Sequence, residues 1–322
     1  MISDEQIKKA IPHLFKGIDI PGLGEKHHGK VRDFYSKGDT LILITTDRQS
    51  AFDVNLGFVP YKGAVLNELT QFWLEQTRDI VDNHLLSVPD ENVMVGKKCT
   101  PIPIEMVVRG YITGSTNTSI WYSYKQGERK IYGLDFPEGL KKNQKLPHAV
   151  ITPTTKGSVS GHDERMTREQ ILSSGVVPQQ IYKQMEEVTY ALFNRGNEIA
   201  QKAGLIMPDT KYEYGMFNGK LTLMDELHTP DGSRFWIKDT YEGRFAKAEE
   251  PENFDKEFIR LWYTQRIDPY KDPIPPMPGD LMIAASRRYI DVYEKLTGKA
   301  FNAFDYPIEN RILANLQKAG II

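Results

Sequence analysis

The chain contains the run DTKYEYGMFNGKLTLMDE at residues 209–226. Both halves of this run alternate polar with apolar or aromatic side chains, the pattern of half-buried strands. Asn218-Gly219 between the halves is a strong turn signal, so the run predicts a β-hairpin. Residues 179–203 just before it have helical spacing, and Gly204 ends this predicted helix.

The register of this hairpin decides where its charges lie. With a two-residue turn at Asn218-Gly219, Glu213 and Asp225 fall on opposite faces. With a three-residue loop over 217–219, Asp225 shares one face with Glu213 and with Asp209 and Lys211. Three acids and a lysine buried dry are costly, and Mg²⁺ bound to nucleotide phosphates would compensate the acids. A solvated polar face is the alternative, which strand patterning alone favours.

The remaining sequence predicts an α+β fold. Helical spacing also occurs at residues 63–85, 280–297 and 307–319, and strand-like runs occur at 31–35, 41–46, 92–98, 102–109 and 205–216. Strands before, between and after helices favour α+β over a regular βαβ array. Residues 137–164 show little periodicity and predict a long loop without regular structure, either disordered or functional.

Composition excludes several classes of protein. The 322 residues carry 41 Lys+Arg and 43 Asp+Glu, a net charge of −2, which argues against a general DNA or membrane-surface binder. Cys99 is the only cysteine, so an intramolecular disulfide is excluded and a reducing compartment fits. With no apolar run long enough to span a bilayer and no signal-peptide core, we expect a cytoplasmic protein.

A glycine-rich segment precedes the first predicted hairpin. Residues 24–30, GEKHHGK, match the start of the P-loop pattern, but Val31 replaces the required Ser or Thr. The segment runs into strands rather than a helix, so it is not a true P-loop. A loop of this kind can still cover phosphates with its backbone N–H groups, with Lys30 and Arg32 supplying charge. An ordinary basic loop is the alternative.

A second candidate anion site lies around Arg109. This arginine leaves an apolar strand, and a Gly114-Ser115 turn follows; together they can hold a phosphate. The turn TPDG at 229–232 delivers Arg234 just beyond the acid-bearing strand. A salt bridge plus a helix cap is the alternative reading of Arg109.

Six blocks in one order resemble the phosphoribosylaminoimidazole-succinocarboxamide synthase (SAICAR synthetase) family in its longer form, across about residues 25 to 297. They are residues 29–33 (GKVRD), 46–53 (TDRQSAFD), 104–115, 161–164 (GHDE), 209–215 and 225–234. The resemblance implies two sheet-containing lobes that form an ATP-grasp-like or kinase-like nucleotide cleft, with C-terminal helices. We expect an N-terminal lobe over 1–105, a central lobe over 106–268 and a C-terminal helical segment over 269–322.

The resemblance implies an ATP-dependent ligase of purine synthesis and five groups of site residues, some of which share members. Gly29, Lys30 and Arg32 would lie in the loop over the ATP phosphates, with Lys211 and Glu213 also on the nucleotide side. Glu213 and Asp225 would bind Mg²⁺, and Arg109, Ser115 and Arg234 would hold the substrate's ribose 5-phosphate. The imidazole-carboxylate and aspartate side would take Lys156, His162, Asp163 and Asp53. Lys211, Asp209 and Asp225 would be catalytic, with Asp209 binding a second ion or orienting Lys211.

The implied partners are small molecules: ATP, L-aspartate and 5-amino-1-(5-phosphoribosyl)imidazole-4-carboxylate, with no nucleic acid or membrane. The carboxylate would first be phosphorylated to an acyl phosphate, which the aspartate amine then attacks. We expect the loop around 156–164 to close as a lid, because water would hydrolyse this intermediate. Adenine would meet backbone near residues 100–104, and the C-terminal helices are compatible with a monomer. A phosphotransferase with another acceptor and a non-catalytic nucleotide sensor are the rival readings.

Overall fold

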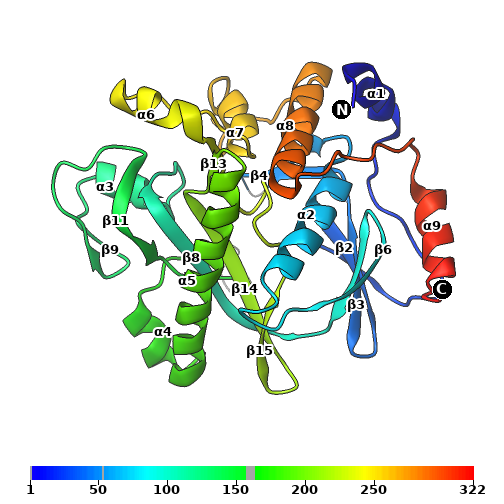
Figure 1. Cartoon of the computed structure of the whole chain (residues 1–322), viewed down its shortest axis with the longest axis horizontal. Helices are drawn as coiled ribbons and strands as arrows, with labels where there is room; N and C mark the ends of the chain where they lie inside the picture. The colour runs from blue at the N-terminus through cyan, green and yellow to red at the C-terminus, as the bar shows by residue number, and fades with distance from the viewer. Residues whose placement is uncertain (1, 53, 157–163) are drawn as a thin grey trace.

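The computed structural model describes residues 2–52, 54–156 and 164–322 and has the predicted α+β composition (Figure 1). Two antiparallel sheets form its centre. The first has strand order β1-β2-β3-β7-β6, and the second has the order β11-β8-β14-β15 with β12 paired to β8. The strands of the first sheet are β1 (Lys26–His28), β2 (Arg32–Lys37), β3 (Thr40–Thr45), β6 (Leu85–Asp90) and β7 (Val93–Lys97). Those of the second are β8 (Thr100–Ile112), β11 (Gln144–Ile151), β12 (Thr154–Thr155), β14 (Asp209–Phe217) and β15 (Lys220–Met224).

Three small hairpins or strand pairs lie outside the two sheets: β4 (Arg48–Ala51) with β5 (Val54–Phe58), β9 (Lys130–Ile131) with β10 (Leu134–Asp135), and β13 (Leu205–Ile206) with β16 (Trp236–Ile237). The helices before the long α5 are α1 (Asp4–Ala10), the 3-10 turn η1 (Ile11–His13), α2 (Lys62–Gln76), α3 (Ile120–Lys125) and α4 (Arg168–Ser174). The others are α5 (Gln179–Lys202), α6 (Lys238–Ala246), α7 (Glu257–Thr264), α8 (Gly279–Thr297) and α9 (Glu309–Lys318). Within the described ranges, none of these helices combines the length and hydropathy needed to cross a bilayer.

The chain passes from the first sheet to the second through Lys98 and Cys99, which link β7 to β8. β8 is long enough to pair with β11, β12 and β14 along its length. The expected boundary between the first two lobes, at residue 105, falls inside this strand. The division of the chain into three parts therefore remains a prediction. β8 is a central strand of the second sheet, with β11 and β12 paired along one edge and β14 along the other.

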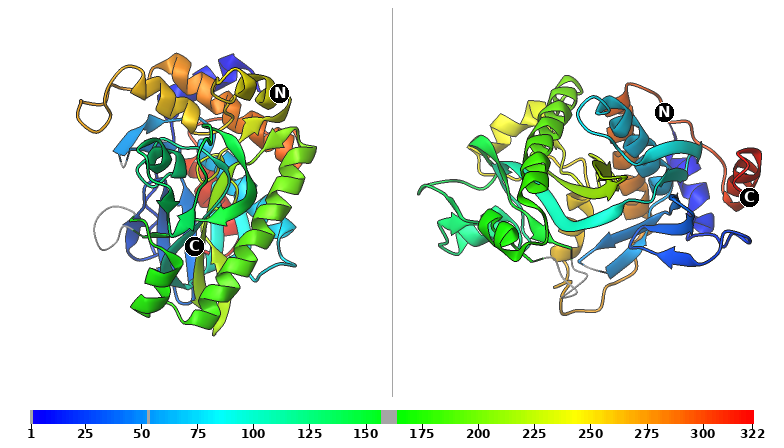
Figure 2. Two further views of the ribbon diagram at one scale, coloured as in Figure 1. Left: turned by 90° about the vertical axis from the view of Figure 1, so that its left-hand side faces the viewer. Right: turned by 90° about the horizontal axis from the view of Figure 1, so that it is seen from below.

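The core of the second sheet lies between β8 and α5, which packs along it (Figures 1 and 2). Ile104, Met106 and Val108 alternate on the inner face of β8 and are buried. Gly196 lets α5 approach closely, since a Cβ there would lie 2.5 Å from the His228 ring. This packing fixes the sheet whose other face carries the charged residues described below.

The C-terminal helices pack against the N-terminal part of the chain. α8 packs against α2 and α1, and α9 contacts β6 at the edge of the first sheet (Figure 1). Ile308, Ile312 and Leu316 are buried with Phe15, Ile44 and other apolar side chains of the N-terminal part. Arg311 adds a bidentate ion pair to buried Asp90, at 2.9 and 3.0 Å. Residues beyond 300, which lie outside the family resemblance, are thus part of the N-terminal core.

Asp47 connects this segment to the start of α2. Its carboxylate accepts hydrogen bonds from the N–H groups of Phe15 (2.9 Å) and Gly63 (3.1 Å) and from the hydroxyl of Tyr306 (2.8 Å). The carboxylate is completely buried. Burial raises its pKa to about 6, although the three hydrogen bonds oppose this shift.

We expect the stability difference between wild type and Asp47→Asn to depend on pH. Because the folded-state pKa of about 6 exceeds the ordinary value of 3.8, the folded protein holds a proton between these values that the unfolded chain has lost. The stability contributed by this shift is full below pH 3.8 and is lost as the pH rises through 6, by up to about 1.4 kcal/mol per pH unit. Urea unfolding between about pH 4.5 and pH 7.5 measures it. A difference that stays constant over this range, as expected for the exposed control Asp39→Asn, would contradict the prediction.

Two sequence predictions about this fold were wrong. Residues 137–164 contain β11 and β12 rather than one unstructured loop; the register of β11 shifts between Lys145 and Val150, which hides the alternation of its side chains. The helix predicted over 63–85 ends at Gln76. Thr77 and Asn83 donate to the carbonyls of Trp73 and Leu74 and so satisfy the end of the helix.

Candidate active site

The acid-bearing hairpin adopts the two-residue turn. β14 and β15 pair Phe217 with Lys220, which leaves Asn218-Gly219 as the turn. For this register the sequence predicts Glu213 and Asp225 on opposite faces. β15, however, ends one residue before Asp225, and Asp225 has a left-handed backbone with φ of 67°. The chain therefore leaves the ladder at Asp225, and the face expected from strict alternation does not apply.

Both carboxylates reach Lys211. The Lys211 ammonium donates to Glu213 Oε1 and lies 4.0 Å from Asp225 Oδ2. It also donates to Glu105 Oε1 at 3.0 Å, and Glu105 lies directly opposite Glu213 on the neighbouring strand β8. Burial would lower the pKa of Lys211, but the charges of Glu213, Glu105 and Asp225 raise it well above its ordinary value. We call Lys211 and these three acids the lysine cluster.

Arg32 brings the first sheet to this cluster. It begins β2, and its Nη1 lies 2.6 Å from Asp225 Oδ1, while Nη2 lies 3.9 Å from Glu226. Burial would raise the pKa of Asp225, but the charges of Arg32, Lys211 and Lys156 together lower it below its usual range. Asp225 thus stays ionised at the point where the two sheets meet.

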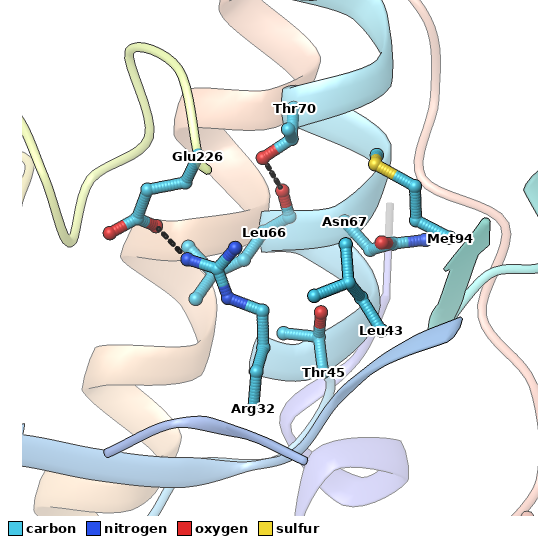
Figure 3. Close-up of a pocket in the computed structure, with 8 residues that line it drawn as sticks. All are labelled: Arg32, Leu43, Thr45, Leu66, Asn67, Thr70, Met94 and Glu226. Carbon is cyan, nitrogen blue, oxygen red and sulfur yellow. Dashed lines mark hydrogen bonds and ion pairs between the residues drawn. The ribbon is translucent and has the colours of Figure 1, made fainter. Parts of the chain in front are cut away.

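A small cavity lies beside Arg32 (Figure 3). Figure 3 shows the Arg32 guanidinium and the Glu226 carboxylate facing each other at one side of it. The rest of its wall comes from β3, α2 and β7: Leu43, Thr45, Leu66, Asn67, Thr70 and Met94. The Arg32–Glu226 ion pair therefore forms one side of a cavity whose other lining side chains are uncharged.

Lys156 reaches the cluster from the second sheet. Directly after β12, its ammonium pairs with Glu213 Oε2, the oxygen that Lys211 does not contact. Thr154 in β12 donates to Glu105 Oε2 at 2.9 Å. Thr155 N–H donates to the Glu164 carbonyl at 2.9 Å, which holds together the two ends of the intervening segment. The predicted site residues His162 and Asp163 in that segment, and Asp53 elsewhere, lie outside the described residues.

The three residues predicted to hold a phosphate lie close together. Asp209 accepts from Arg109 Nη1 at 3.3 Å and from Arg234 Nη1 at 2.6 Å. Ser115 Oγ lies 3.5 Å from Glu257 Oε1, and Glu257 Oε2 lies 3.7 Å from Arg234 Nη2. We call Arg109, Arg234 and Ser115 the arginine site. Among the contacts of the described chain, Asp209 pairs with these two arginines, and its expected role of binding a second ion or orienting Lys211 stays a prediction.

Within the glycine-rich segment 24–30, residues 26–28 form β1, and residues 29–31 make the tight connection to β2. Gly29 N–H donates to the Arg32 carbonyl at 2.7 Å, and a Cβ on Gly29 would lie 2.9 Å from that carbonyl oxygen, so the position requires glycine. Lys30 at its tip is exposed. Buried Asp33 fixes the base of this connection, with oxygen Oδ1 at 3.1 Å from His28 and 2.5 Å from Arg48. The predicted phosphate loop is thus held at its base and exposed at its tip.

Sequence reasoning missed three acids of the site: Glu105, Glu226 and Glu257. Glu105 carried a signal, because it is a charged residue inside the apolar run 102–108. Glu226 follows Asp225 directly and was read as part of the strand pattern. Glu257 gave no signal, since it is 23 residues from Arg234 and reaches the site only through the position of α7.

Two antiparallel sheets that meet at a lysine cluster, beside a site built from two arginines, define an α+β enzyme with an ATP-grasp-like fold. A family model described as SAICAR synthetase matches residues 25–277. The chain belongs to this family.

Individual relatives agree with the family match. The phosphoribosylaminoimidazole-succinocarboxamide synthase of Legionella pneumophila (strain Paris) is 50% identical over 312 residues, covering 96% of this chain and 99% of the relative. A solved SAICAR synthase from Saccharomyces cerevisiae, described as complexed with SAICAR, is 30% identical and covers 90% of this chain and 100% of its own, with a TM-score of 0.76. A structure described as SAICAR synthetase (Type-2) in complex with ADP has the same fold, with a TM-score of 0.66 at 22% identity, covering 87% of this chain and 100% of its own.

These findings confirm the predicted activity. The chain is an ATP-dependent ligase of de novo purine synthesis, which joins L-aspartate to the carboxylate of 5-amino-1-(5-phosphoribosyl)imidazole-4-carboxylate.

Proposed function

We propose that the lysine cluster is where the terminal phosphoryl group of ATP passes to the substrate carboxylate, giving an acyl phosphate and ADP. The aspartate amine then attacks the acyl carbon, phosphate leaves, and the amine loses a proton to give the amide. The observation that carries this proposal is the convergence of Glu213 and Asp225 on Lys211 where the two sheets meet. A carboxylate is a poor electrophile, so amide formation requires this kind of activation.

Positive charge in the cluster suits this step. Each pair of like charges about 4 Å apart costs on the order of 4 kcal/mol at an effective dielectric near 20. ATP and the substrate carboxylate bring several such charges together. Lys211 belongs to the cluster, and Lys156 and Arg32 pair with its acids. We assign the exposed Lys30, at the tip of the connection between β1 and β2, to the same phosphates. Their role is to position the reactants and to neutralise charge during transfer.

The side chains present fit a Mg²⁺ ion. Glu213 and Asp225 offer hard carboxylate oxygens, and Mg²⁺ is commonly held by one or two carboxylates together with substrate phosphates. Within the described residues, no group of three or more His, Cys, Asp or Glu is arranged as a complete metal site. The nucleotide phosphates would therefore complete the ligand set. When bound, the ion would supply further neutralisation of phosphate charge.

The arginine site is placed for the substrate's 5-phosphate. Asp209 and Lys211 are two residues apart on β14, and side chains at this spacing share a face, with Cα atoms about 7 Å apart. Arg109 and Arg234 surround Asp209, while the reacting groups would surround Lys211. A ribosyl-imidazole with a phosphate at one end and a carboxylate at the other spans such a separation. We assign the 5-phosphate to Arg109, Arg234 and Ser115, and the carboxylate to the lysine cluster.

Several finer assignments stay predictions. They are the adenine position near residues 100–104, the aspartate side formed by Lys156, Asp53, His162 and Asp163, and the closure of the segment after Lys156. A cytoplasmic location, a monomeric state and the absence of nucleic-acid partners are also predictions.

Isotope transfer tests the acyl phosphate. Substrate labelled with ¹⁸O in its carboxylate should pass one labelled oxygen to the released phosphate, and hydroxylamine should trap the hydroxamate when aspartate is left out. Unlabelled phosphate together with normal amide formation would rule the intermediate out. ADP release that depends on both the imidazole carboxylate and aspartate separates the ligase from a nucleotide sensor and from a phosphotransferase with another acceptor.

We expect nucleotide and Mg²⁺ to bind cooperatively. Both carboxylate oxygens of Glu213 are paired with lysines, and Asp225 is paired with Arg32. Phosphates that draw the cations away free the carboxylates for the metal, so each ligand removes the obstacle to the other. Calorimetric titration with ADP should give an affinity about 10- to 100-fold higher with Mg²⁺ than with EDTA. Equal affinities under the two conditions would contradict this arrangement.

A further inference from the structure

The arginine site contains two carboxylates that differ in how they are held. Asp209 lies on β14 between the two guanidiniums and contacts both. Glu257 comes from α7, a separate element, and its contacts to the site are longer: 3.7 Å to Arg234 Nη2 and 3.5 Å to Ser115 Oγ. Asp209 is therefore a fixed part of the site, whereas Glu257 touches it from outside.

Glu257 contacts two of the three groups that the proposed function assigns to the substrate phosphate. Its carboxylate oxygens are the acceptors for Arg234 and Ser115 that phosphate oxygens would be in the complex. The substrate phosphate and this carboxylate would thus compete for the same donors.

The displaced carboxylate has another partner. Arg260, one turn further along α7, lies 3.2 Å from Glu257 Oε2. Burial would raise the pKa of Glu257, but the charges of Arg234 and Arg260 lower it, so the group is a carboxylate anion. When a phosphate displaces the Glu257 carboxylate from Arg234, the carboxylate stays paired with Arg260. The displacement therefore costs little free energy.

We propose that Glu257 is a specificity-determining residue that restricts the arginine site to dianionic phosphates. This proposal rests on the proposed function of the arginine site. A phosphate carries nearly two negative charges and three acceptor oxygens, so it gains from replacing a single carboxylate. A ligand carboxylate that displaced Glu257 would only replace one singly charged carboxylate with another, so it would gain little binding free energy. Glu257 therefore keeps carboxylates, including those of the second substrate L-aspartate, out of the site for the phosphate.

Calorimetric titration with ribose 5-phosphate, with and without succinate, tests this on Glu257→Gln. We expect ribose 5-phosphate to bind about tenfold tighter than to wild type, a change of roughly 1.4 kcal/mol. Succinate should weaken this binding in the variant and leave wild type unaffected. Glu249→Gln, which removes an exposed carboxylate paired with Arg244 on another surface, is the matched control and should behave as wild type.

Binding to Glu257→Gln that is unchanged or weaker than in wild type, or that succinate does not affect, overturns the proposal. If Glu257→Gln does not fold, Glu257→Asp retracts the carboxylate by one methylene and should tighten binding in the same direction; no tightening overturns the proposal equally. Arg234→Gln separates the two levels of the argument. If Arg234→Gln binds ribose 5-phosphate as tightly as wild type, the phosphate site itself is misplaced. If Arg234→Gln loses this affinity while Glu257→Gln binds as wild type does, only the role of Glu257 is refuted.

Discussion

Replacing Asp225 with Asn is expected to lower kcat by about 10³-fold or more, because in the proposed function this carboxylate would hold the Mg²⁺ ion that neutralises charge on the transferred phosphoryl group. Asn keeps the shape of the side chain and the left-handed backbone at this position, since Asn tolerates positive φ. The fold should therefore be retained. Arg32 loses its 2.6 Å partner but still has Glu226 at 3.9 Å, so its charge is not left isolated.

The measurement is steady-state ADP release with saturating substrates, together with circular dichroism and thermal unfolding. Asp39→Asn, in the exposed turn between β2 and β3, is the matched control and should keep wild-type kcat. Activity of Asp225→Asn within about tenfold of wild type would show that this carboxylate does not serve the reaction.

Lys211→Met is expected to reduce kcat by a similar factor. The same change is expected to strengthen the binding of a divalent metal ion. Removal of the ammonium leaves Glu105, Glu213 and Asp225 facing one another with only Lys156, Arg32 and the Thr154 hydroxyl as described partners. Repulsion among the three carboxylates makes a divalent cation more favourable there. We expect Mg²⁺ or Mn²⁺ alone to bind at least about tenfold more tightly than to wild type.

This pair of readouts separates two explanations of lost activity. If Lys211 only supported the fold, Lys211→Met would lose both activity and metal binding as the site collapsed. Titration with Mn²⁺ in the absence of nucleotide distinguishes the cases, and Lys220→Met, an exposed lysine on the same hairpin, is the control. Unchanged or weaker Mn²⁺ binding by folded Lys211→Met would contradict the balance of charge described for the cluster.

Local chemistry made part of this site predictable. The Asn-Gly turn, the alternation along β14 and the glycine at position 29 each have a local cause, and each was found where the sequence indicated. The meeting of Glu213 and Asp225 was expected for the wrong reason: the register is the two-residue one, and the left-handed backbone at Asp225 brings the carboxylate back. A single residue that leaves the strand geometry is not visible in an alternating pattern.

The missed features depend on contacts between distant segments. Glu257 reaches Arg234 only through the position of α7, and Lys156, which was predicted as a site residue, reaches Glu213 only because β12 pairs with β8. β11 was missed because its pairing with β8 is irregular, so side-chain alternation fails just where the strand lies. The pairing of Asp209 with two arginines likewise requires β8 and β14 to be neighbours with Arg109 opposite Asp209. Which strands lie side by side is decided when the whole sheet assembles, so the local sequence does not show it.

The burial of Ile308, Ile312 and Leu316 among N-terminal side chains has a consequence for how the chain matures. During synthesis the first sheet emerges early, but Phe15, Tyr35 and Ile44 meet their last apolar neighbours only after α9 has left the ribosome. The nascent N-terminal half therefore carries an exposed apolar surface until residues 308–316 have been made and can cover it.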